Sequence, residues 1–319
     1  MYRFKYTFWD ENRFPGFRES ISNLYDTCIN HYKNTCKKKD FELKMFDTFF
    51  NDLENYFRVL ITNGIVTQKN FVNILEQLKK LDLVVLLPKS KRNFYGVNFG
   101  YQIAINPEIE GMDEYSEDFM KQLVVSHELG HLINNKWVVD TKELSKRLYK
   151  DPVVSKTLKS IDAGSYKYIQ AGFSLLDEVV AEEAAEEVTY FLYKKKRPKK
   201  EIRNINYNPY LTNYILYGEL QDLALNFSKS IKYIKDVKNI SDKEVMLKLV
   251  RRSFDDEFLI ELENEILSSD IDKKIKLITM LGCMGKIKVA TYDVVGLNKD
   301  KEDIDINKYV ELFNSVKRR

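Results

Sequence analysis

The chain has 319 residues, of which 44% are hydrophobic, so it has room for two or three units with packed cores. Its 51 basic and 48 acidic residues leave a net charge of only +3, which gives no reason to expect a nucleic-acid partner. The sequence has no stretch of about 18 apolar residues, so no membrane span is predicted. Its first residues lack the apolar segment of a signal peptide, so none is expected. The three cysteines have no CxxC spacing, which is typical of a reducing cytoplasm, so a cytoplasmic protein is expected.

Residues 1–82 are predicted to form an N-terminal helical region. Aromatic-rich amphipathic runs extend from Phe41 to Leu60 and from Asn70 to Leu81, and Asn63-Gly64 separates them. Aromatic side chains at helical spacing usually belong to a core.

A small sheet is predicted next. Leu83 to Leu87 is an apolar run ended by Pro88, and Tyr95 to Ile105 holds two short alternating stretches broken by glycines. We expect Tyr101 to Asn106 to be an edge strand that pairs with an extended substrate, although an inner strand would have the same pattern. The predicted substrate-binding residues are Tyr101, Ile103 and Ile105.

The segment His127-Glu128-Leu129-Gly130-His131 contains two of the three histidines of the chain. It has the HExxH pattern of zinc hydrolases. Apolar residues at spacings of three and four predict a helix from Glu117 to Ile133, so both imidazoles can reach one metal ion from one helix face. Glu128 lies about 100° around that helix, where it can contact a water bound to the ion.

A catalytic zinc ion needs a third protein ligand and an open fourth position. The metzincin continuation is excluded because Asn134 and Trp137 stand where glycine and histidine are required. His31 lies far upstream, so a carboxylate is the better candidate. A second helix with one small-residue face is predicted from Leu175 to Val188, and it carries several acidic residues, not all of which can be ligands.

At this point the chain resembles the gluzincin metallopeptidases, in which a second helix supplies a glutamate ligand with an acidic residue four positions later. Glu178 followed by Glu182 fits that spacing, and EVVAE is similar to the ExxAE segment of lethal-factor-type catalytic domains. The run Ile103 to Pro107 followed by HELGH is also similar to the core of ImmA/IrrE-like peptidases. These matches span about Tyr95 to Tyr193.

The resemblance implies that Glu178 is the third metal ligand, with Glu182 as the other candidate. Glu182 is predicted to accept the second ring N–H of a zinc-bound histidine, which would fix its tautomer. Asp177 competes for that role. The resemblance also implies an oxyanion donor shortly before the glutamate helix, for which Tyr168 and then Tyr166 are the candidates.

The basic run from Lys194 to Lys200 ends the glutamate helix and begins a linker. Beyond it, helical patterns at 208–235, 242–253 and 255–268 predict a C-terminal helical region over residues 201–319. The expected fold is therefore α+β, with a zincin-like core at 83–200 made of the small sheet, the HExxH helix and the glutamate helix.

The predicted function is a zinc-dependent metallopeptidase with one zinc ion per chain, held by His127, His131 and Glu178. Glu128 is the predicted general base for a zinc-activated water, and the substrate is a protein or peptide. The alternative is a zincin-fold regulatory or binding module with little or no peptidase activity.

Overall fold

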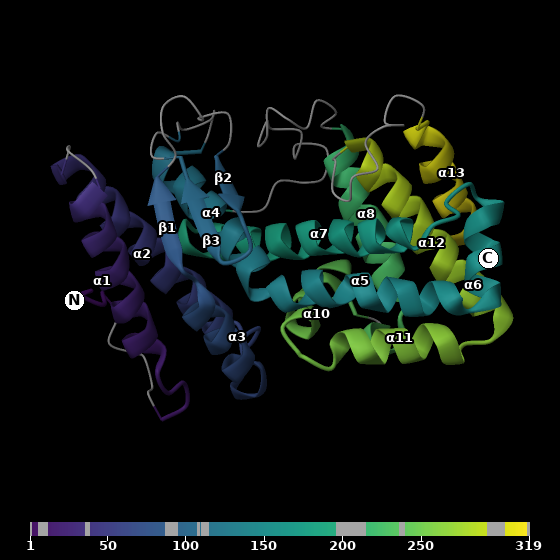
Figure 1. Ribbon diagram of the computed structural model, residues 1–319, viewed down its shortest axis with the longest axis horizontal. Coiled ribbons are helices and arrows are strands. Elements are labelled where there is room, and N and C mark those ends of the chain that lie inside the picture. Colours follow the sequence, from purple (N-terminus) through teal and green to yellow (C-terminus); the bar gives the residue numbers. More distant parts are fainter. Residues whose placement is uncertain are drawn as a thin grey trace. The chain divides into compact units, whose positions relative to one another are not determined.

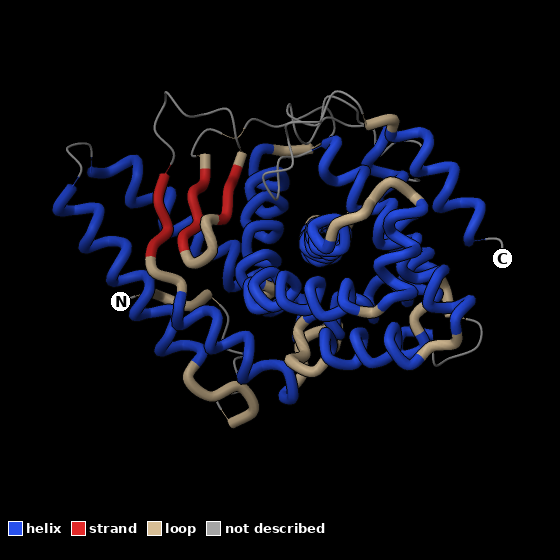
Figure 2. Tube along the Cα trace, turned by 45° about the vertical axis from the view of Figure 1, so that its right-hand side comes forward, coloured by secondary structure: helices blue, strands red, loops and turns tan. Residues whose placement is uncertain are grey.

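The computed structural model describes residues 2–5, 12–35, 39–86, 95–106, 109, 115–195, 215–235, 240–291 and 304–317. Within these residues the chain is mostly helical, with one small three-stranded sheet (Figures 1 and 2). It divides into two compact units: unit 1 comprises Met1–Asn135 and Ala181–Arg197, and unit 2 comprises Lys136–Val180 and Pro198–Arg319. No helix among the described residues is long and apolar enough to cross a membrane.

Unit 1 begins with three helices that share one aromatic core. Phe17, Phe57 and Phe71 are almost completely buried, and the rings of Phe17 and Phe57 meet edge to face with centroids 5.1 Å apart. The second and third helices also pack against the HExxH helix, so residues 1–82 belong to the same unit as the sheet. The three helices are α1 (Phe17–Thr35), α2 (Lys39–Thr62) and α3 (Gln68–Lys80).

The sheet contains β1 (Leu83–Leu86), β2 (Gly96–Asn98) and β3 (Gln102–Ile105) in the order β1-β3-β2 (Figure 1). The middle strand, β3, runs parallel to β1 and antiparallel to β2. The prediction that Tyr101 to Asn106 forms an edge strand is therefore wrong. Short apolar alternation does not reveal how many neighbours a strand has. Within the described residues β2 is the edge strand next to the HExxH helix, which it contacts.

The HExxH helix, α4, runs over Glu117–Ile133, as predicted. The hydroxyl of Ser116 accepts a hydrogen bond from the backbone N–H of Phe119, and Glu117 and Asp118 lie in the first turn, where carboxylates suit the helix dipole. The glutamate helix, α7, is much longer than predicted. It runs unbroken over the 27 residues Tyr166–Leu192 and passes through the boundary between the two units.

Unit 2 is helical throughout its described residues, and α12 contacts α6, α8, α11 and α13. The helices predicted at 242–253 and 255–268 correspond to α10 and α11, while residues 208–214 of the other predicted helix lie outside the described residues. Besides part of α7, unit 2 contains α5 (Asn135–Lys150), α6 (Pro152–Ser160), α8 (Ile215–Ser230), α9 (Lys232–Lys235), α10 (Asp242–Ser253), α11 (Phe258–Ser268), α12 (Ile271–Thr291) and α13 (Ile306–Lys317).

Candidate metal centre

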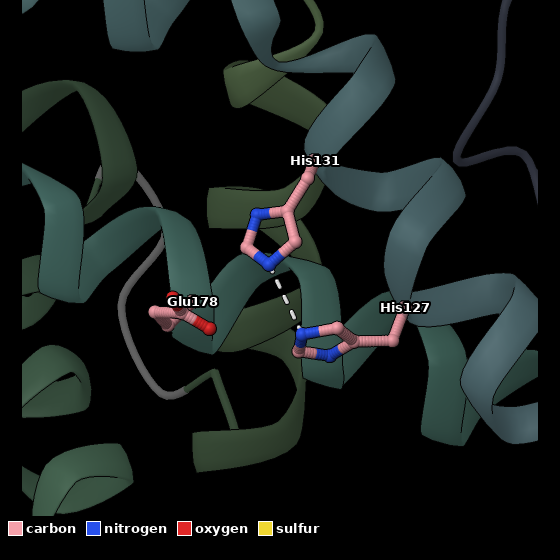
Figure 3. Close-up of side chains that lie close together, drawn as sticks. All are labelled: His127, His131 and Glu178. Carbon is pink, nitrogen blue, oxygen red and sulfur yellow. Dashed lines mark hydrogen bonds between the residues drawn. The ribbon is translucent and has the colours of Figure 1, made fainter. Parts of the chain in front are cut away.

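His127 and His131 project from successive turns of α4 with their Nε2 atoms facing each other (Figure 3). These two nitrogens are 3.0 Å apart. Two nitrogens that each lie 2.0–2.1 Å from a tetrahedral zinc ion are separated by about 3.3 Å. The histidine pair is therefore close to the geometry that a shared zinc ion requires.

Glu182 orients the first of these histidines. Its Oε2 lies 2.9 Å from Nδ1 of His127, and the two side chains are 11% and 22% exposed. A carboxylate at this distance favours the tautomer with the proton on Nδ1, which leaves the Nε2 lone pair available for a metal. The predicted contact between Glu182 and a histidine of the HExxH segment is therefore present. Glu182 occupies the position beside Nδ1 of His127 for which Asp177 was the other candidate.

Glu178 lies on α7 one helical turn before Glu182. One ligand atom from each of His127, His131 and Glu178 lies within 4.8 Å of the other two, and all three residues are partly exposed (Figure 3). Two imidazoles and one carboxylate form the donor set of a catalytic zinc site, with a fourth position left for water. The residues present therefore fit a zinc ion, and Glu178 fits the third-ligand position because Glu182 is already bound to His127.

Gly130 allows α4 and α7 to approach closely in unit 1. A Cβ at this position would lie 2.8 Å from the Cα and 2.9 Å from the Cβ of Ala181. Any side chain would therefore push the HExxH helix away from the helix that carries Glu182. The glycine of HELGH and the alanine of EVVAE are the two residues that meet.

Glu128 faces the edge strand β2. It is 7% exposed, and a Cβ at Gly96 would lie 2.9 Å from its Oε1. Asn98 of the same strand donates a hydrogen bond to the backbone carbonyl of Glu128, with Nδ2 and O 3.3 Å apart. The predicted general base is thus held between its own helix and β2.

Two of the three residues predicted to bind substrate are buried side chains of β3. Ile103 and Ile105 are 0% and 5% exposed, so both belong to the core of unit 1. Tyr101 is 38% exposed, and the Lys80 ammonium lies 5.9 Å from its ring centroid. These positions agree with an inner strand, which is paired on both sides. The side chains of Ile103 and Ile105 are buried rather than exposed to solvent.

The two tyrosines predicted as oxyanion donors lie within α7. Tyr166 and Tyr168 lie in the first turn of α7 rather than in a preceding loop. Tyr168 precedes Glu178 by ten residues of continuous helix, which is about 15 Å along the axis. Its ring faces the Lys286 ammonium, 4.3 Å from the centroid. The proposed oxyanion role of these tyrosines therefore stays a prediction, and their position on α7 does not favour it.

Lys288 is a functional candidate that was not predicted from the sequence. Its Nζ lies 3.0 Å from Oε1 of Glu178, and only 3% of its side chain is exposed. Lys288 continues the buried stripe Leu277, Leu281 and Met284 on α12 at spacings of three and four. A lysine on an apolar helix face requires an anionic partner, and this pattern was the available signal.

A cavity of about 640 Å³ lies elsewhere in unit 1, and no predicted site residue lines it. Asp52 lies in its wall and is only 6% exposed. Burial, followed by the nearby carboxylate of Asp118, raises the pKa of Asp52 to about 8. This carboxyl bears on the stability of unit 1 rather than on the metal centre.

No family model matches the chain, and neither a curated protein nor a solved structure is similar enough to count as a match. No relative therefore supplies a substrate, a cofactor or a partner. A proposal for the function of the site therefore rests on the chemistry of His127, Glu128, His131 and Glu178.

Proposed function

We propose that the protein is a zinc-dependent metallopeptidase whose metal ligands are His127, His131 and Glu178. The observation that carries the proposal is the histidine pair, whose Nε2 atoms are 3.0 Å apart with a Glu178 ligand atom within 4.8 Å. Zinc in such a site lowers the pKa of a bound water towards about 7 and polarises a carbonyl.

The chain's own residues supply the remaining functions. Glu128 follows the first ligand on the same helix and accepts the proton of the attacking water, which it then delivers to the leaving amine. Glu182 holds His127 in the tautomer that exposes Nε2. Substrate backbone can pair with β2, the edge strand beside Glu128, so that main-chain hydrogen bonds align the scissile bond with the general base.

A second candidate function is a regulatory or binding module in which the metal centre holds the fold. The burial of Glu128 favours this second function, because a general base must be accessible to its substrate. Glu128 is only 7% exposed and lies against Gly96. The two functions differ in whether the zinc-loaded protein hydrolyses peptides.

The test is the cleavage of a proteome-derived peptide library by the zinc-loaded protein and by its Glu128→Gln variant, with mass-spectrometric readout. The amide keeps the shape of the side chain but cannot accept the proton, so we expect unchanged zinc content and a rate lower by about 10²–10⁴-fold. Glu117→Gln, an exposed change on the same helix, is the control and should retain full activity. Cleavage that survives Glu128→Gln would contradict the peptidase mechanism, and a zinc-loaded wild type that cleaves nothing would favour the regulatory module.

A further inference from the structure

Lys288 contributes a buried positive charge beside the proposed third ligand. Its side chain is 3% exposed, and its Nζ lies 3.0 Å from Oε1 of Glu178, with both residues in unit 2. Few lysines are buried this deeply unless a carboxylate compensates the charge. We propose that Lys288 is a positioning residue that holds one oxygen of Glu178 and leaves the other to bind the metal ion. This inference rests on the proposed zinc site.

The charges on α7 explain why Glu178 needs such a partner. Glu182 lies one turn away on the same helix, and like charges at this spacing repel each other. The Glu178 side chain is 33% exposed, so it has room to turn away from Glu182 towards solvent. The Lys288 ammonium opposes that movement because it binds Glu178 and neutralises its charge.

The position of Lys288 is set by a close contact between α12 and α7 within unit 2. A Cβ at Gly285 would lie 1.8 Å from the carbonyl oxygen of Tyr168, and a Cβ at Gly172 would lie 2.5 Å from that of Leu281. The two backbones therefore touch where the helices cross. Lys288 follows Gly285 by almost one turn, so the crossing fixes the point from which the lysine reaches Glu178.

Two effects of Lys288 on metal affinity oppose each other. Its positive charge repels a divalent cation, whereas its hydrogen bond holds a ligating carboxylate in place before the ion arrives. Loss of a group that orients a metal ligand typically weakens metal affinity about 10–100-fold. Because the Glu178 side chain is 33% exposed and has a repelling neighbour in Glu182, we expect the orienting effect to dominate.

The experiment measures zinc affinity by competition with a chromogenic chelator for the wild type, Lys288→Met and Lys288→Arg. Lys274→Met is the matched control, since Lys274 lies on the same helix and pairs with Asp151 at 2.9 Å with a similarly buried side chain. Thermal melting of each metal-free protein measures the loss of stability. The visible absorption of the cobalt(II)-loaded proteins reports whether the ligand set and its geometry change.

We expect Lys288→Met to bind zinc about 10-fold more weakly and to alter the cobalt spectrum, while Lys274→Met changes only the melting temperature. Lys288→Arg keeps a cation and a donor, so it should bind zinc more tightly than Lys288→Met. Wild-type zinc affinity in Lys288→Met, or no gain from arginine over methionine, would overturn the positioning role. A wild-type protein that binds no zinc would instead overturn the zinc site itself.

Discussion

A proton on Nδ1 of His127 leaves the Nε2 lone pair available for the proposed metal ion, and the Glu182 carboxylate beside Nδ1 favours that tautomer. The spacing of Glu178 and Glu182 identified both carboxylates from the sequence, but their roles remained open because one helical turn separates two chemically identical groups. The 2.9 Å contact between Glu182 and His127 supports the proposal that the two glutamates have different roles. Lys288 was not predicted from the sequence because its partner, Glu178, lies 110 positions away in the chain.

Separate alanine variants of the two glutamates should therefore behave differently. Glu178→Ala removes one of three proposed ligands, so zinc binding should be lost. Glu182→Ala removes only the group that orients His127, so zinc affinity should fall by about 10–100-fold. Equilibrium dialysis against zinc measures both. The opposite order would show that Glu182 is the ligand and that the assignment is wrong by one turn.

At the scale of elements, α4 could be predicted almost exactly and α7 only in part. The helix Glu117–Ile133 has a serine cap, an acidic first turn and regular apolar spacing, all of which are local signals. The start of α7 also has a local signal, because Ser165 precedes the helix and its Oγ accepts a hydrogen bond from the backbone N–H of Lys167. The predicted helix began only at Leu175, so Tyr166 and Tyr168 were placed before the helix rather than in its first turn. The inner position of β3 was not predicted either, although both of its partner strands lie close in the sequence, at 83–86 and 96–98. The apolar pattern of a short strand does not show whether it is paired on one side or on both.

Gly130→Ala tests the contact between α4 and α7. Alanine normally stabilises a helix by up to about 1 kcal/mol relative to glycine, but here its Cβ would meet the backbone of Ala181 at 2.8 Å. Overpacking of this kind costs about 1–3 kcal/mol. We therefore expect a lower melting temperature together with weaker zinc binding.

Gly282→Ala is the control for this variant. It is also a helical glycine, but the close contacts of its Cβ would be with the ends of the Ile161 and Leu158 side chains, at 2.8 Å each. Those flexible ends can shift, so stability should change less and zinc affinity should stay the same. Equal effects of the two substitutions would show that the close approach at Gly130 has no special role.

At the scale of the whole molecule, the two units are interleaved along the chain rather than consecutive. The predicted division at residues 82 and 200 followed changes in composition and period, which are local properties. The structure instead groups residues 1–82 with the sheet and α4, because α2 and α3 pack against α4. A division of this kind depends on long-range contacts that composition does not encode.

The stability of unit 1 should depend on pH through Asp52. In an unfolded chain an aspartate has a pKa near 3.9, whereas burial raises the pKa of Asp52 to about 8 in the folded protein. Between these values the folded state binds more protons, so this group lowers the free energy of unfolding as pH rises from about 4 to 8. Asp52→Asn removes the effect.

Urea unfolding of the metal-free wild type and Asp52→Asn at pH 5 and pH 9 measures this contribution. The variant should gain stability relative to the wild type on going from pH 5 to pH 9, by an amount on the order of a few kcal/mol. A difference between the two proteins that does not change with pH would contradict the raised pKa of Asp52.

The most direct test of the proposed metal centre is an anomalous diffraction map, recorded at the zinc absorption edge from crystals of the zinc-loaded protein. The proposal predicts one peak within about 2.0–2.2 Å of Nε2 of His127, Nε2 of His131 and one carboxylate oxygen of Glu178. A zinc-loaded crystal with no peak between the two histidines, or with a peak ligated by a carboxylate other than Glu178, would contradict it.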